Sequence, residues 1–148
     1  MQNDFTHWAI YLKKIPIMLV DTDIVSYYMK KILLVKQTWE QYLLAGNTIF
    51  ISQISVLEVL NGLKAKNAST QLAHFNALLS NLTLLEISFQ TLELASDLYA
   101  YLYQNGKHSG QYDLLIAATA LEHHLPLCTN NIKDYQNFPN LILVNWTV

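Results

Sequence analysis

The stretch Ile17-Met18-Leu19-Val20-Asp21-Thr22-Asp23 joins a short apolar run to a cluster of small polar side chains. A four-residue apolar run of this kind is typical of a buried strand. Similar runs follow over residues 48–51, 82–87, 125–128 and 141–144. Segments with helical periodicity separate them, over 24–34, 35–45, 55–66, 69–81, 89–104 and 112–123. Strands that alternate with helices predict a three-layer α/β/α sandwich with a mostly parallel central sheet.

The composition supports one well-packed domain. A chain of 148 residues buries roughly 70% of its unfolded surface on folding. Hydrophobic residues make up 52% of the chain and charged residues 14%, which argues against disorder. The only cysteine, Cys128, excludes an internal disulfide framework and is expected to be a small buried hydrophobic residue. No apolar run approaches the roughly 18 residues of a membrane span, and residues 1–16 lack the layout of a secretory signal, so we expect a cytoplasmic protein without membrane contact.

The basic residues are all lysines. The chain has nine of them, no arginine and a net charge of −2. Lys30, Lys31 and Lys36 gather in one segment, and Lys64 and Lys66 in another. Solvation of an ordinary surface is the simpler interpretation, and a local patch that attracts a polyanion is the alternative.

Four acidic residues lie where a predicted strand ends or a predicted helix begins. They are Asp21, Glu58, Asp113 and, more loosely, Asp134. Because ligands of open parallel sheets bind at the carboxyl ends of the strands, we expect these acids to converge at that edge.

Each acid also has a purely structural interpretation. Asp23 is expected to be the N-cap of the helix that follows. Ser55-Val56-Leu57-Glu58 matches a capping box, and Asp113 is suited to the positive end of a helix. We favour a functional role for Asp21, Glu58 and Asp113, and leave Asp134 open because turn-forming residues precede it.

Grouped carboxylates without cationic partners predict a bound divalent metal ion. Two unit charges about 4 Å apart repel by roughly 4 kcal/mol at an effective dielectric constant near 20. Oxygen ligands alone select Mg²⁺ or Mn²⁺ rather than zinc. Such an ion stabilises charge on a phosphoryl oxygen and activates water, which favours phosphodiester hydrolysis.

Several segments in order resemble PIN-domain ribonucleases, and in particular the VapC toxins of bacterial toxin–antitoxin pairs. The segments are LVDTDIVSY (19–27), ISVLEVLNG (54–62), YDLLIAATA (112–120), CTNNIKDY (128–135) and VNW (144–146). The resemblance implies a PIN fold, a Mg²⁺- or Mn²⁺-dependent endoribonuclease that cleaves RNA, inhibition by a small cognate antitoxin protein, and a homodimer.

The same resemblance assigns roles to individual residues. It places the catalytic acids at Asp21, Glu58 and Asp113, of which Asp21 and Asp113 would hold the metal ion. The fourth acidic position of many members falls on Asn131, which keeps an oxygen but loses a charge, and Asp134 is the acid nearby. Thr22 and Thr129 would complete the outer shell together with Asn131 and Asp134.

The predicted PIN-like domain covers residues 18–148. Chains of the family usually begin near Met18, so residues 1–17 would be an extension of unknown role, or the start codon lies too far upstream.

Two other functions fit parts of the sequence. A catalytically weakened scaffold that binds RNA or a partner protein is favoured by the missing fourth acid and the absent arginines. A haloacid-dehalogenase-type phosphatase would use Asp21 as nucleophile and Asp23 as general acid, but the chain lacks the Gly-Asp metal motif of that family.

Overall fold

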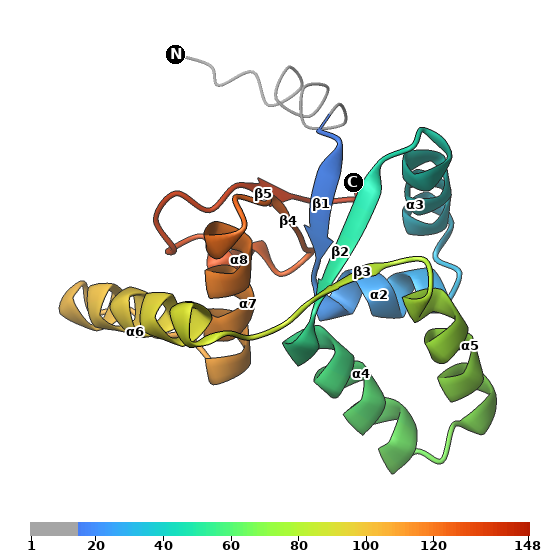
Figure 1. Ribbon diagram of the computed structural model, residues 1–148, viewed down its shortest axis with the longest axis horizontal. Coiled ribbons are helices and arrows are strands. Elements are labelled where there is room, and N and C mark those ends of the chain that lie inside the picture. The colour runs from blue at the N-terminus through green and yellow to red at the C-terminus, as the bar shows by residue number, and fades with distance from the viewer. Residues whose placement is uncertain (1–14) are drawn as a thin grey trace.

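A five-stranded parallel sheet forms the centre of the protein, whose computed structural model describes residues 15–148. The strands are β1 (Ile17–Val20), β2 (Thr48–Ser52), β3 (Thr83–Leu85), β4 (Leu127–Cys128) and β5 (Leu143–Val144). Their order is β3-β2-β1-β4-β5, and all four pairings are parallel. The predicted α/β sandwich with a mostly parallel sheet is confirmed (Figure 1).

Helices cover both faces of this sheet. They are α2 (Thr22–Met29), α3 (Leu33–Leu44), α4 (Gln53–Ala65), α5 (Ser69–Leu79), α6 (Phe89–Gln104), α7 (Gln111–Glu122) and the short α8 (Ile132–Tyr135). In Figure 1, α2, α3 and α5 lie on one side of the strands, and α6, α7 and α8 on the other.

The boundary between the first two helices differs from the prediction. The sequence predicted a helix over 24–34, but α2 ends at Met29 and α3 already starts at Leu33. Lys31 has a φ of 60° in the connection, so the helix cannot continue through it. Leu33 and Leu34, which start α3, are 68% and 45% exposed.

Side chains of the central strands alternate between two hydrophobic cores. Met18 and Val20 of β1 pack with the core under α2 and α3, where Trp39 is fully buried. Leu19 points to the opposite core, under α6 and α7. This period of two is the pattern of a strand buried on both faces. Cys128 is fully buried, as predicted.

The fold includes residues just before Met18. Ile17 pairs with Thr48 in the sheet, the Ile15 carbonyl accepts a hydrogen bond from the Tyr42 hydroxyl at 2.7 Å, and the Pro16 carbonyl accepts one from the Thr48 amide. Residues 15–17 therefore belong to the domain, whereas the sequence predicted an extension over 1–17. The remainder of that extension lies outside the described residues.

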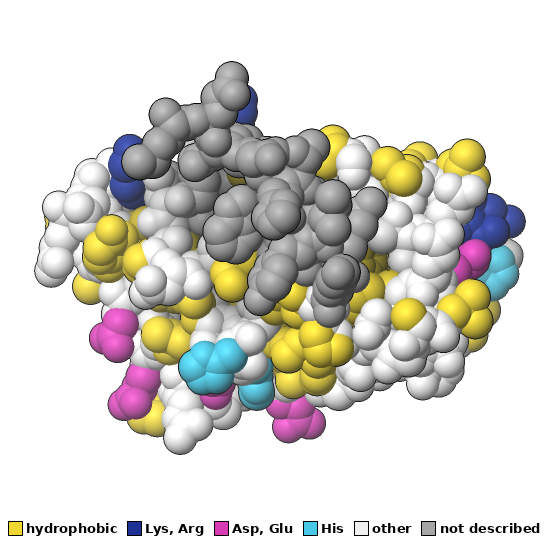
Figure 2. Space-filling view, turned by 90° about the horizontal axis from the view of Figure 1, so that it is seen from above, with side chains coloured by type: hydrophobic (Ala, Val, Ile, Leu, Met, Phe, Trp, Pro, Cys, Tyr) yellow, Lys and Arg dark blue, Asp and Glu magenta, His cyan; other side chains and the backbone are white. Residues whose placement is uncertain are grey.

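The end of the molecule at which β1 begins carries hydrophobic and polar side chains side by side (Figure 2). Across residues 15–148, none of the helices combines the length and the apolar character that crossing a membrane requires.

Candidate functional site

Asp21 lies at the carboxyl end of the central strand. Its amide donates a hydrogen bond to the Cys128 carbonyl at 2.9 Å, which continues the pairing of β1 with β4 by one residue. Its Oδ1 accepts a hydrogen bond from the Thr22 amide at 2.8 Å, so Asp21 is the N-cap of α2. The sequence assigned this cap to Asp23, and that prediction is wrong. The side chain of Asp21 is only 3% exposed.

Tyr135 connects Asp21 to Asp113. The buried Tyr135 hydroxyl lies 3.2 Å from Oδ1 of Asp21 and 3.1 Å from Oδ1 of Asp113, and it donates to both. Thr129 donates its hydroxyl to Oδ2 of Asp21 at 2.7 Å. Two acids separated by 92 positions in the chain thus accept hydrogen bonds from the same tyrosine hydroxyl.

The role of Tyr135 was not predicted from the sequence. A tyrosine followed three residues later by Phe138, both buried, was a signal for a packed element, and a buried tyrosine hydroxyl needs a hydrogen-bond partner. Nothing in the local sequence shows which partner it has.

Glu58 reaches the same area from α4. Ser52 is the N-cap of this helix, because its Oγ accepts a hydrogen bond from the Ser55 amide at 3.1 Å. The capping box predicted from Ser55 to Glu58 is therefore wrong, and Glu58 lies on the second turn, free of any capping role. The Thr22 hydroxyl donates to Oε1 of Glu58 at 2.9 Å and lies 3.0 Å from Oγ of Ser55.

Asp23 closes the other side of the site. Its Oδ2 accepts a hydrogen bond from the Asn130 amide at 2.9 Å. Its Oδ1 is buried and has no hydrogen-bond partner among residues 15–148. An unpartnered carboxylate oxygen is costly to bury, and Asp23 adds a second negative charge beside Asp21 that raises the pKa of Asp21.

The remaining predicted residues lie around the edge of the site. The Asn131 amide donates to Oγ1 of Thr129 at 3.0 Å, while the rest of Asn131 is exposed. Asp134 is exposed on α8 and close enough to Asp113 to raise its pKa. Asp113 itself is half-buried in the first turn of α7, as predicted.

Burial raises the pKa values of the four inner acids, and nearby negative charges add to it at Asp21, Glu58 and Asp113. Burial, and next the charge of Asp23, raise the pKa of Asp21 to about 7. Burial is also the main cause that raises the pKa of Asp23, Glu58 and Asp113. The charges of Asp113 and Asp23 raise the pKa of Glu58 further.

Within residues 15–148, no lysine forms an ion pair with these acids. The ion pairs among residues 15–148 are Lys36 with Glu40 and His123 with Glu122, both outside the site. The donors that face the acids are hydroxyls and backbone amides, and the free acceptors are carboxylate oxygens. This chemistry fits a hard divalent cation such as Mg²⁺ or Mn²⁺.

The ligands do not form a closed cage. In the described part of the chain, no three acidic, histidine or cysteine side chains stand together as a complete ligand set. The Asp21–Asp113 pair still suits Mg²⁺, which is usually bound through one or two carboxylates and keeps several water molecules.

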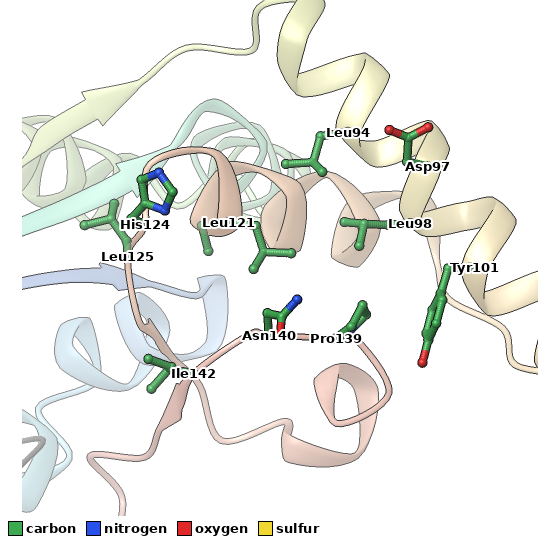
Figure 3. A pocket seen from close by; sticks show the side chains of 11 residues that line it. Leu94, Asp97, Leu98, Tyr101, Leu121, His124, Leu125, Pro139, Asn140 and Ile142 are labelled. Atoms are coloured by element: carbon green, nitrogen blue, oxygen red, sulfur yellow. The ribbon is translucent and has the colours of Figure 1, made fainter.

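Two cavities in the described part of the chain bear on where the site lies. A groove of about 430 Å³ runs from Thr22 and Glu58 outward between α2, α4 and α5. A second cavity of about 580 Å³ is lined mainly by leucines of α6 and α7 and by the 139–142 segment. The close-up in Figure 3 shows Leu94, Leu98 and Leu121 facing it. None of the predicted site residues lines the second cavity, so the groove is the one that belongs to the carboxylate site.

The fold and the acids at its strand ends define a known class of protein. Residues 18–138 match the PIN domain, and the chain belongs to this family. Family membership also removes the haloacid-dehalogenase alternative.

Within that family the chain is VapC-like. It is 36% identical over 107 residues to the ribonuclease VapC2 of Rickettsia felis, which covers 72% of this chain and 80% of the relative. The crystal structure of VapBC2 from Rickettsia felis, bound to a DNA fragment from their promoter, matches with a TM-score of 0.80 and 33% identity over 88% of this chain and 98% of that chain. VapBC-1 from nontypeable Haemophilus influenzae matches with a TM-score of 0.78 and 26% identity over 89% and 99%.

Proposed function

We propose that this protein is a metal-dependent endoribonuclease and the toxin of a toxin–antitoxin pair. One observation carries the proposal: the Tyr135 hydroxyl bonds both Asp21 and Asp113, and no lysine of residues 15–148 forms an ion pair with either acid. Glu58, from a third element, lies near enough to Asp113 for that charge to raise the pKa of Glu58. The relatives named above are ribonucleases, or are solved as VapBC complexes. Their names support RNA as the substrate and a small antitoxin protein as the partner.

Asp21 and Asp113 are the proposed ligands of Mg²⁺ or Mn²⁺. When bound, such an ion would polarise a phosphoryl oxygen and lower the pKa of water. Tyr135 and Thr129 orient the oxygens of Asp21, and Tyr135 also orients Asp113.

Glu58 is the proposed acid–base residue. The Thr22 hydroxyl fixes one of its oxygens, which leaves Oε2 directed to accept a proton from the attacking water. Its raised pKa brings its proton affinity closer to neutral pH, which suits a general base.

The weakened scaffold is the second candidate function. Asn131 supports it, because an amide stands at the fourth acidic position and its side chain makes no hydrogen bond within the described residues. Asp134 lies one turn further along α8 than Asn131. Its negative charge raises the pKa of Asp113.

Substitution of either metal ligand tests the nuclease. We expect Asp21→Ala and Asp113→Ala to reduce Mn²⁺-dependent RNA cleavage by at least about a hundredfold and to abolish growth inhibition on induction. Asp97→Ala, which removes an exposed acid of α6, is the matched control and should keep both activities.

Isothermal titration with Mn²⁺ separates the two candidate functions. Binding by the wild type that is lost in Asp113→Ala supports the enzyme. Full RNA cleavage by either ligand variant would refute the assignment, and a wild type that binds RNA without binding Mn²⁺ would favour the scaffold.

A further inference from the structure

The lysines of the described chain gather at the outer end of the groove that starts at Glu58. Lys30 and Lys66 line this groove, one from the end of α2 and the other from the end of α4. Lys31 follows Lys30 in the chain, and Lys64 lines an adjoining cavity at the turn between α4 and α5. Two of the seven lysines within residues 15–148 therefore line the groove itself, and two more are their neighbours in the chain.

The two lysine clusters are distant in sequence and come together only through the fold. The helices that carry them contact each other and α5. The lysines of these two clusters form no ion pairs within the described residues. There, the lysine that pairs with a carboxylate is Lys36, which lies 3.8 Å from Glu40. On the end of the molecule seen in Figure 2, by contrast, the lysines in view lie apart from one another.

The groove thus combines an anionic inner end with a cationic outer end. Thr22 and Glu58 form the inner end, where carboxylates would repel a phosphate unless a cation is bound. Lys30 and Lys66 form the outer end, about one helix-length of α2 away. A chain of phosphates that passes through the site would meet the lysines on one side of the cleavage point.

We infer that Lys30 and Lys66 bind backbone phosphates of single-stranded RNA next to the scissile bond, so that the groove between α2, α4 and α5 is the path by which the strand leaves the carboxylate site. This inference rests on the proposed function for its substrate. The chemistry that recognises the strand is the phosphate charge alone, because lysine is a point charge without the bidentate geometry of arginine. The groove therefore contributes affinity without reading the base sequence.

Salt dependence of RNA binding tests this path directly. The full chain is titrated into a short fluorescent single-stranded RNA of mixed sequence, in EDTA, and the dissociation constant is measured by anisotropy at several salt concentrations. Loss of two phosphate contacts should reduce the slope of log K against log salt by about 1.4, since each contact to a single strand contributes roughly 0.7. We expect this reduction in the double variant Lys30→Ala/Lys66→Ala, together with weaker binding at low salt.

Two matched variants separate the groove from general charge. Lys36→Ala/Lys107→Ala removes the same number of charges, from an ion-paired lysine and from the loop after α6, and should keep the wild-type slope. Lys30→Arg/Lys66→Arg should retain most of the binding. In cleavage assays with Mn²⁺, the alanine double variant of the groove should raise KM and leave kcat within about twofold.

The outcomes assign the groove unambiguously. Equal salt-dependence slopes for the two alanine double variants, or wild-type RNA affinity in Lys30→Ala/Lys66→Ala, would contradict the proposed RNA path through the groove. A wild type that binds RNA with the expected slope but never cleaves it would refute the nuclease while the groove assignment stands.

Discussion

A single phenol bonds both acids that are the proposed metal ligands. The Tyr135 hydroxyl has one proton and two carboxylate acceptors, at 3.2 Å and 3.1 Å. A phenol has a single proton, which it donates to one carboxylate at a time or shares between both. The hydroxyl therefore lowers the repulsion between Asp21 and Asp113 without neutralising either. Burial, and next the negative charges of Asp21 and Asp113, raise the pKa of Tyr135 far above the usual value, so it remains a donor at any working pH.

Tyr135→Phe should weaken metal binding. The substitution removes one oxygen and keeps the ring that packs against Phe138. Loss of a hydrogen bond to a charged group costs roughly 1.5 kcal/mol, which corresponds to about a tenfold rise in the dissociation constant for Mn²⁺. Isothermal titration at about pH 9 measures it while Asp21, with its pKa of about 7, is ionised.

Tyr42→Phe is the control for that measurement. It removes another hydrogen-bonded hydroxyl from a buried tyrosine, but in the core on the other face of the sheet. It should reduce stability similarly and leave the affinity for Mn²⁺ unaltered. Tighter Mn²⁺ binding in Tyr135→Phe would mean that the hydroxyl occupies the place of the ion, and would contradict the positioning role.

The helices that carry the site are fixed by their caps. Asp21 and Ser52 each end a strand and cap the helix that follows, so α2 and α4 begin directly at the carboxyl edge of the sheet. This places Thr22 and Glu58 within hydrogen-bond distance although 36 positions separate them. A cap that moved by one residue would rotate Glu58 away from Thr22 by about 100°.

Ser52→Ala tests the assignment of the α4 cap. Removal of a serine N-cap costs about 1 kcal/mol of unfolding free energy, which urea denaturation at constant m-value would detect. Ser69→Ala is the comparison, since Ser69 lies inside the start of α5 and Ala68 occupies the cap position there without a side-chain hydrogen bond. Should Glu58→Ala prove as destabilising as Ser52→Ala, the capping box predicted from the sequence would be restored.

Elements with strong local signals were predicted well, and those governed by tertiary contacts were not. The helix Phe89–Gln104 was predicted with its true boundaries, because Ser88 caps it and Asn105-Gly106 ends it. The ends of β1 and β2, next to which Asp21 and the helix of Glu58 begin, followed from apolar runs alone. Helix α8 has only four residues, so no periodicity could reveal it. The partners of Tyr135 lie 114 and 22 positions away and are not specified by the local sequence. The caps at Asp21 and Ser52 are local, but Asp23 and Ser55 offered competing cap residues two and three positions later.

The whole fold is destabilised by the acids that it gathers. For Asp21 the pKa is 3.8 in the reference state and about 7 in the folded protein, so the folded state binds more protons between these values. The free energy of unfolding then decreases as pH rises from about 4 to about 7 and is level outside that range. A bound divalent cation would reverse the effect at neutral pH, because it binds the folded state only.

We therefore expect the metal-free protein to lose stability as the pH rises, by up to about 4 kcal/mol for Asp21 alone. Urea denaturation in EDTA across this pH range measures the loss, and the same series with Mn²⁺ should show stability restored near neutral pH. Asp21→Asn is the matched variant: its amide oxygen still accepts from the Thr22 amide, and its amide nitrogen can donate to the Thr129 hydroxyl. It should flatten the pH dependence and be more stable than the wild type above pH 7 without metal. A wild type whose stability rises steadily with pH over this interval would show that Asp21 is ionised at no cost, and that the pocket needs no cation to balance it.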